Sequence, residues 1–197
     1  MPTLTAFRGA ALVVALTATL NSCDSQSPNG TTALSVRLKD APGDVQHAFV
    51  TITEVDLMGS GGAQVLTQAP VTTDLLTLAT DVLTLVQDVE VPSGSYHELR
   101  FKISGVCVAV DDGNGGSTVY ATEDYDASPC GGSATGTLKA PSYAQSGLKV
   151  KMADGALELT GPAKILLVDF DVTQSFGHEA NGWVMHPVVT GGEVTTE

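Results

Sequence analysis

Hydrophobic and polar residues alternate along most of the chain from Ala33 onward. The segment ALSVRLK, residues 33–39, places Leu34, Val36 and Leu38 on one side and polar residues on the other. A period of two is typical of a β-strand with one buried face. Similar short segments recur to residue 190, and turn residues such as Gly, Pro and Asp separate them. This pattern predicts a mostly β fold, an antiparallel β-sandwich of the immunoglobulin-like or transthyretin-like kind.

Some segments carry more specific signals for strands and hairpins. In AFVTITEVDLM the apolar phase shifts between Ile52 and Val55, so a strand here needs a β-bulge to keep its core face. GSGG, residues 59–62, predicts the tip of a hairpin. The pair Asp154 and Gly155 predicts a second hairpin, formed by GLKVKM and ALELT.

Two other segments are expected to depart from strand structure. TDVLTLVQD, residues 80–88, has the pattern of one short helix, with Asp81 near its start. GGEVTTE, residues 191–197, is expected to fray because it is polar, rich in glycine and terminal.

The first 22 residues have the pattern of an export signal. Arg8 is the only charged residue before Asp24, and the uncharged run AALVVALTATL, residues 10–20, follows it. Such a run has signal-peptide length and is shorter than the about 20 apolar residues of a membrane span. A buried amino-terminal helix is the alternative.

The end of this run, Leu20-Asn21-Ser22-Cys23, resembles the lipobox of bacterial lipoproteins. Asn21 is bulkier and more polar than is usual there, whereas the other three residues match. The resemblance implies that Cys23 carries a lipid, which would anchor the protein to a cell-envelope membrane on its exported side. Ordinary secretion with an unmodified cysteine is the alternative. We therefore expect a signal peptide at 1–22, a flexible tether at 23–32 and a folded domain at 33–194.

The chain has three cysteines, and lipidation of Cys23 leaves Cys107 and Cys130 as an even pair. Exported proteins fold in an oxidising compartment, where such a pair forms a disulfide. The bond would close the Gly- and Asp-rich excursion 111–129 and stabilise the fold by about 3 kcal/mol in the chain-entropy model. Two buried free thiols are the alternative.

A series of short motifs extends over about residues 32–194. They are LKDAPGD followed by VTITEVDL, then DLLTL, VPSGSYHELRF and PSYAQSGLKV, and finally VDFDVTQSF followed by HPVV. In order and spacing the series resembles the bacterial family called domain of unknown function 4382. The resemblance implies an envelope lipoprotein with a mostly β domain and no established activity.

Charge and motifs narrow the classes of function. The net charge of −13 argues against nucleic acid as a partner, because phosphates require clusters of Lys and Arg. The sequence contains no P-loop, no G-x-S-x-G elbow and no complete H-E-x-x-H motif, so no catalytic residue is assigned. We expect a protein that is not an enzyme and has no cofactor. It would attach to the membrane through Cys23 and bind a glycan, a protein or another surface partner.

Acidic residues supply candidates for a metal site. Asp40 and Asp44 flank a tight turn, and Asp169 and Asp171 point the same way on an apolar strand. Their carboxylates could bind Ca²⁺ if the turn and the strand end meet. An envelope hydrolase or Ca²⁺-dependent enzyme is therefore the alternative function. A turn-capping role for Asp40 and an ion pair for Asp169 are the simpler interpretation.

Aromatic residues supply candidates for ligand binding. Trp183 follows a turn, and Tyr120 and Tyr125 lie in or near loops, where their rings could stack on sugar faces. A core position for Trp183 is the simpler interpretation. A purely structural envelope protein without a small ligand is the third functional hypothesis.

Overall fold

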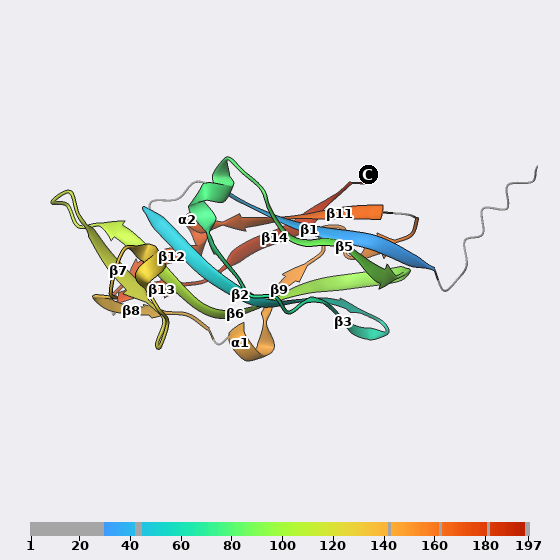
Figure 1. Ribbon diagram of the computed structural model, residues 1–197, viewed down its shortest axis with the longest axis horizontal. Helices are drawn as coiled ribbons and strands as arrows, with labels where there is room; N and C mark the ends of the chain where they lie inside the picture. The colour runs from blue at the N-terminus through green and yellow to red at the C-terminus, as the bar shows by residue number, and fades with distance from the viewer. Residues whose placement is uncertain (1–29, 42–44, 142, 162, 181, 196–197) are drawn as a thin grey trace, which may run out of the picture.

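The computed structural model describes residues 30–41, 45–141, 143–161, 163–180 and 182–195. The signal peptide, Cys23 and most of the predicted tether lie outside these residues. The described part folds into two β-sheets that pack face to face, and short helical segments connect some of the strands (Figure 1). The predicted mostly β sandwich is confirmed. No helix among the described residues is long and apolar enough to cross a membrane.

The smaller sheet has the strand order β14–β11–β1–β5. Its central strand β1 (Thr31–Ala41) runs parallel to β11 (Ala163–Asp171) and antiparallel to β5 (Leu83–Pro92). At one edge, β14 (Val188–Thr195) is antiparallel to β11. The sheet is therefore mixed, whereas the sequence pattern predicted antiparallel strands. The parallel pair joins two segments at opposite ends of the domain sequence, which local patterns do not reveal.

The larger sheet has the order β12–β13–β8–β7–β6–β2–β3. At its centre, β6 (Gly94–Asp111) is antiparallel to β2 (His47–Gly59). The remaining strands of this sheet are β3 (Gly62–Thr67), β4 (Val71–Asp74), β7 (Ser117–Ala121), β8 (Gly136–Lys139), β9 (Leu148–Lys151), β10 (Leu157–Leu159), β12 (Phe176–Glu179) and β13 (Gly182–Met185). The helical segments are η1 (Leu75–Ala79), η2 (Ser128–Cys130), α1 (Tyr143–Ser146) and α2 (Val172–Ser175).

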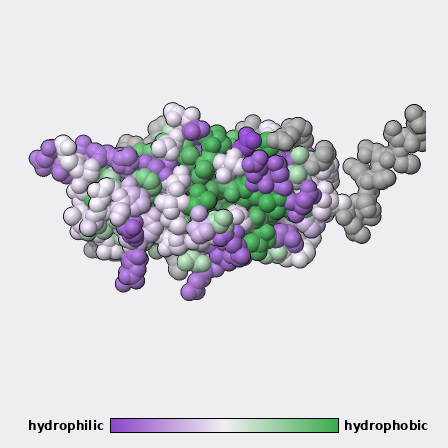
Figure 2. Space-filling view, in the orientation of Figure 1, coloured by the Kyte–Doolittle hydropathy of each residue, from purple (hydrophilic) through white to green (hydrophobic). Residues whose placement is uncertain are grey.

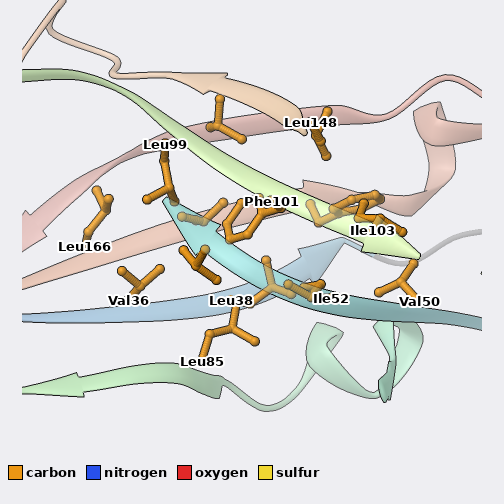
Figure 3. Packing of buried hydrophobic residues seen from close by; sticks show 14 of the residues in the cluster. Val36, Leu38, Val50, Ile52, Leu85, Leu99, Phe101, Ile103, Leu148 and Leu166 are labelled. Atoms are coloured by element: carbon orange, nitrogen blue, oxygen red, sulfur yellow. The ribbon is translucent and has the colours of Figure 1, made fainter. Parts of the chain in front are cut away.

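The hydrophobic core lies between the two sheets. The predicted inward residues of β1 are buried and face those of the larger sheet, as Figure 3 shows for Val36, Leu38, Leu99 and Phe101. Side chains from β2, β5, β9 and β11 complete the same cluster. Alternation along each strand places one face in this cluster, and burial of that apolar face is the main force that holds the sheets together.

Two local predictions are confirmed by the strand register. The pairing of β2 with β6 shifts between Thr51 and Glu54, so a bulge lies where the apolar phase changes. Gly59 pairs with Gly62 at the tip of the hairpin formed by β2 and β3. Gly62 has a φ of 102°, which explains why glycine is suited to that position.

The predicted helix at 80–88 is wrong, because residues 83–92 form β5. Leu85 and Val86 are buried in the core, and β5 pairs with β1 along most of its length. A short 3₁₀ helix occurs instead at Leu75–Ala79, where the Asp74 side chain accepts a hydrogen bond from the amide of Leu76. Pairing with β1 therefore determined the structure of this segment more strongly than its helix-like sequence pattern did.

The predicted hairpin at Asp154 and Gly155 is also wrong. β9 and β10 do not pair with each other, because both run antiparallel to β6 along the same edge. Their inward residues are buried in the main core, so the chain passes along β6 rather than folding back on itself.

The predicted ends of the domain also need correction. β1 begins at Thr31, so the last two residues of the expected tether belong to a strand. Residues 191–195 belong to β14 and pair with β11 as far as Thr195, so this part of the carboxyl end does not fray.

Candidate binding cleft

The predicted disulfide is present between Cys107 and Cys130. The S–S distance is 2.06 Å, and the bond joins β6 to the short helix η2. Both cysteines are buried in a second small hydrophobic cluster, to which Ala109, Val119 and Ala127 also contribute. The disulfide therefore fastens the excursion after β7 to the face of β6 that is turned away from the main core.

The acidic candidates have local partners where the structure describes them. Asp169 forms an ion pair with Lys39 on the neighbouring strand, with 3.1 Å between its Oδ2 and the lysine Nζ. Asp171 caps α2, because its Oδ1 accepts a hydrogen bond from the amide of Gln174 at 3.0 Å. The side chain of Asp40 and the whole of Asp44 lie outside the described residues. Within the described part of the chain, no group of three or more His, Cys, Asp or Glu residues could hold a metal ion.

Two of the aromatic candidates lie together and one lies apart. The rings of Tyr120 and Trp183 have centroids 6.0 Å apart, and His178 meets Trp183 edge-on at 5.8 Å. Both Tyr120 and Trp183 are half-buried against the main core. Tyr125 instead packs against the cluster around the disulfide, and its hydroxyl lies 2.9 Å from Oγ1 of Thr51. The three candidates therefore do not form one platform.

A cleft opens in the larger sheet where β7 ends. The strand order places β7 between β6 and β8 as far as Ala121. The chain then turns away, and the amide of Thr122 donates the last hydrogen bond to β6, at the carbonyl of Val106. A cleft of about 410 Å³ lies here, and α1 closes one side of it. This volume is in the range of ligand sites in proteins.

The cleft has an apolar floor and a polar rim. Ile103, Val106 and Leu138 line it and belong to the buried main core. Its rim includes exposed polar residues, among them Glu123 and Lys139. The half-buried Tyr143 also lines the cleft, and burial raises the pKa of its phenol. An apolar floor with a few polar groups is suited to binding an amphipathic ligand.

The buried carboxyl groups of Asp74 and Asp56 lie on β-strands outside the cleft lining. At the start of β2, Asp74 accepts hydrogen bonds from the amide of Ala48 at 3.0 Å and from Nδ1 of His47, whose distance to Oδ2 is 2.6 Å. On the outer face of β2, burial and then the charge of Glu54 raise the pKa of Asp56, which is 6% exposed. The hydrogen bond from Lys102 lowers the pKa of Glu54.

Comparison with known protein families places most of the folded domain in one family. Residues 31–187 match the family described as Domain of unknown function (DUF4382). The chain belongs to this family. No curated protein and no solved structure matches it. The DUF4382 match extends from the first residue of β1 to the residue before β14, so it includes the larger sheet and three strands of the smaller one, and the cleft lies inside the DUF4382 domain.

Sequence reasoning did not find the cleft. Its described lining comes from three separate parts of the DUF4382 domain, namely 103–106, 122–123, and 137–141 with 143–144. One signal was present, because the alternation of β8 breaks at PSYAQSG, where α1 interrupts the sheet. That break does not reveal which strand edges it leaves without a partner.

Proposed function

We propose that the protein is a lipid-anchored, non-catalytic binding module of the cell envelope and that the cleft beside α1 is its binding site. The main support for this proposal is the cleft itself, which has a volume of about 410 Å³ and a buried apolar floor. The ionisable residues in its lining are Glu123, Lys139 and Tyr143. Among the described residues, this set has no histidine, no cysteine and no pair of carboxylates, which favours recognition over acid–base catalysis.

Two features support the exported location. The signal-like segment and the lipobox-like residues before Cys23 supply the sequence support. The disulfide between Cys107 and Cys130 supplies independent support, because such bonds persist in oxidising compartments outside the cytosol.

The arrangement of strands also suits a tethered module. In Figure 1, β1 begins at one end of the molecule, and β7, β8, β12 and β13 are gathered at the opposite end. A chain anchored through Cys23 would therefore present those strands away from the membrane.

Figure 2 shows a hydrophobic area near the middle of the face in view and hydrophilic residues toward the end that carries β7.

The anchor is tested by membrane fractionation of the full chain. Cys23→Ser removes the acceptor thiol, so we expect the variant to move from the membrane fraction to the soluble fraction, whereas the matched variant Ser25→Ala stays with the membrane. Membrane association that survives Cys23→Ser would contradict the proposed anchor.

The binding site is tested by filling it. Ala144 lines the cleft and is exposed on α1, whereas its neighbour Gln145 is exposed and does not line it. Ala144→Trp should block the cleft, and Gln145→Trp controls for the added ring. We expect ligands selected from a saccharide array or a peptide library to bind the native protein and Gln145→Trp but not Ala144→Trp. A selected ligand that binds all three proteins equally would place recognition elsewhere.

A further inference from the structure

The cleft lies where one edge of β6 has no strand neighbour among the described residues. One edge of β6 carries three strands in succession, and all of them run antiparallel to it: β10 at Gly94–Tyr96, β9 at Glu98–Phe101 and β7 at Cys107–Asp111. β2 occupies the other edge. Between β9 and β7, residues 102–105 of β6 have no strand neighbour at this edge among the described residues. At roughly 3.3 Å per residue, this gap is roughly 13 Å long.

A second strand edge faces the same gap. β8 pairs with β7 through Gly136 and Thr137, and the next two residues, Leu138 and Lys139, pair only with β13 on the far side among the described strands. The cleft lies between these two residues and the 103–105 segment of β6. The ends of the gap are set by Thr122, where β7 turns away, and by α1, which precedes β9.

We propose that this gap binds a short extended peptide of a partner protein by strand addition, so that the peptide continues the line of β7 between β6 and β8. The inference rests on the proposed function and names the chemical class of its ligand. Main-chain amides and carbonyls along an unpaired strand edge are strong hydrogen-bonding groups, and an added strand satisfies them. A peptide antiparallel to β6 would run parallel to β8, as β7 already does.

The side chains around the gap determine which peptides fit. A strand in this position has alternate side chains on opposite faces of the sheet. On one face they would meet the buried Ile103, Val106 and Leu138, which favours an apolar side chain there. On the other face they would meet the exposed rim, where Glu123 and Lys139 favour polar side chains. The preferred peptide therefore alternates apolar and polar residues.

A saccharide is the competing ligand for a cleft of this size. Sugar recognition relies on stacking against exposed aromatic faces, and Tyr143 is the aromatic side chain in the lining, where it is half-buried. Two strand edges that have no strand neighbour at the cleft among the described residues are better suited to a peptide backbone, so the observations favour the peptide.

The test combines selection with changes to the peptide backbone. A phage library of random peptides of about eight residues, of which roughly four can lie in the gap, is selected against the full chain. Enriched sequences are synthesised, and binding is measured by calorimetry to the native protein, Ala144→Trp and Gln145→Trp. Each selected peptide is then remade with an N-methyl group on one amide at a time, from end to end, which removes a donor but leaves the side chains unchanged.

We expect alternating peptides that bind the native protein and Gln145→Trp and lose binding to Ala144→Trp. Successive amides of a strand between β6 and β8 face the two strands in turn, so methylation of any amide inside the gap should weaken binding about tenfold, whereas methylation of terminal amides outside the gap should have less effect. Equal tolerance of N-methylation at every position would overturn strand addition. If no peptide is enriched and a saccharide binds in a way that Ala144→Trp abolishes, the peptide inference fails and the binding module stands. If neither class binds, both proposals fail.

Discussion

At the scale of single residues, the clearest departure from ordinary surface chemistry is the carboxyl group of Asp56. It is 6% exposed, and its Oδ1 has no hydrogen-bond partner in the described part of the chain. Burial and the adjacent Glu54 raise its pKa above the usual 3.8, although Lys102 and Arg100 on β6 act in the opposite direction. The folded protein therefore holds this proton more tightly than the unfolded chain does.

The resulting pH dependence has a definite sign. Because the folded-state pKa is raised, the free energy of unfolding falls as pH rises from 3.8 through the folded-state value. Asp56→Asn keeps the neutral shape and removes the titration. We therefore expect urea unfolding to show that the variant gains stability relative to the native protein as pH rises from about 4 to about 7. Asp81→Asn, at an exposed position, is the control, and a pH-independent difference for Asp56→Asn would contradict the prediction.

A matched pair of glycines tests the packing beneath the disulfide-bound excursion. A Cβ at Gly105 would lie 2.1 Å from Cδ2 of Tyr125, whereas a Cβ at Gly177 would meet nothing within 4 Å. Gly105→Ala must displace the ring that hydrogen-bonds Thr51, so we expect the free energy of unfolding to fall by about 1–3 kcal/mol. Gly177→Ala should leave it nearly unchanged. Equal effects of the two substitutions in denaturant titrations would show that the ring moves at no cost.

At the scale of elements, the disulfide fastens the segment between β7 and β8 to β6. The excursion between β7 and β8 contains η2, whose Cys130 joins Cys107 of β6 across a sequence separation of 23 residues. Removing both thiols with Cys107→Ser and Cys130→Ser should lower the free energy of unfolding by about 3 kcal/mol, because the unfolded chain regains loop entropy. Denaturant titration of the native protein with and without reductant provides the same comparison without mutation. A midpoint unchanged by reduction would contradict the prediction.

Some elements of the fold could be predicted from local sequence signals alone. The alternation around Leu34, the bulge near Ile52 and the glycine turn at 59–62 each have a cause within a few residues, so the sequence predicted them correctly. The segment at 83–92 has weaker local preferences, and its pairing with β1 made it a strand. β9 and β10 likewise follow the edge of β6, because burial there outweighed the turn signal between them.

At the scale of the whole molecule, the net charge of −13 dominates the long-range electrostatics. Like charges on one compact domain repel each other, and dissolved salt screens that repulsion over a Debye length that falls from about 30 Å at 0.01 M to about 3 Å at 1 M. We therefore expect the Tm of the protein to rise as NaCl is added over this range. The excess of acidic over basic residues predicts this increase. A Tm that falls in calorimetry would contradict it, because it would mean that ion pairs such as Lys39–Asp169 stabilise the fold by more than the repulsion destabilises it.

The sequence by itself determined the features whose physical causes are local. Alternation of apolar residues specified a mostly β domain, and the number of cysteines led to the pair Cys107 and Cys130. The residues that end at Cys23 led to a proposed membrane anchor. These inferences depend on neighbours in the chain or on simple counts.

The tertiary structure alone decided which strands became neighbours. The parallel pair of β1 and β11 and the gap between β6 and β8 arise from segments far apart in the sequence, so no local pattern encodes them. Burial of apolar surface selected this arrangement, and among the described strands it left residues 102–105 of β6 without a neighbour at the edge that faces the cleft. The proposed binding site exists because the two sheets could bury their shared core without filling that position.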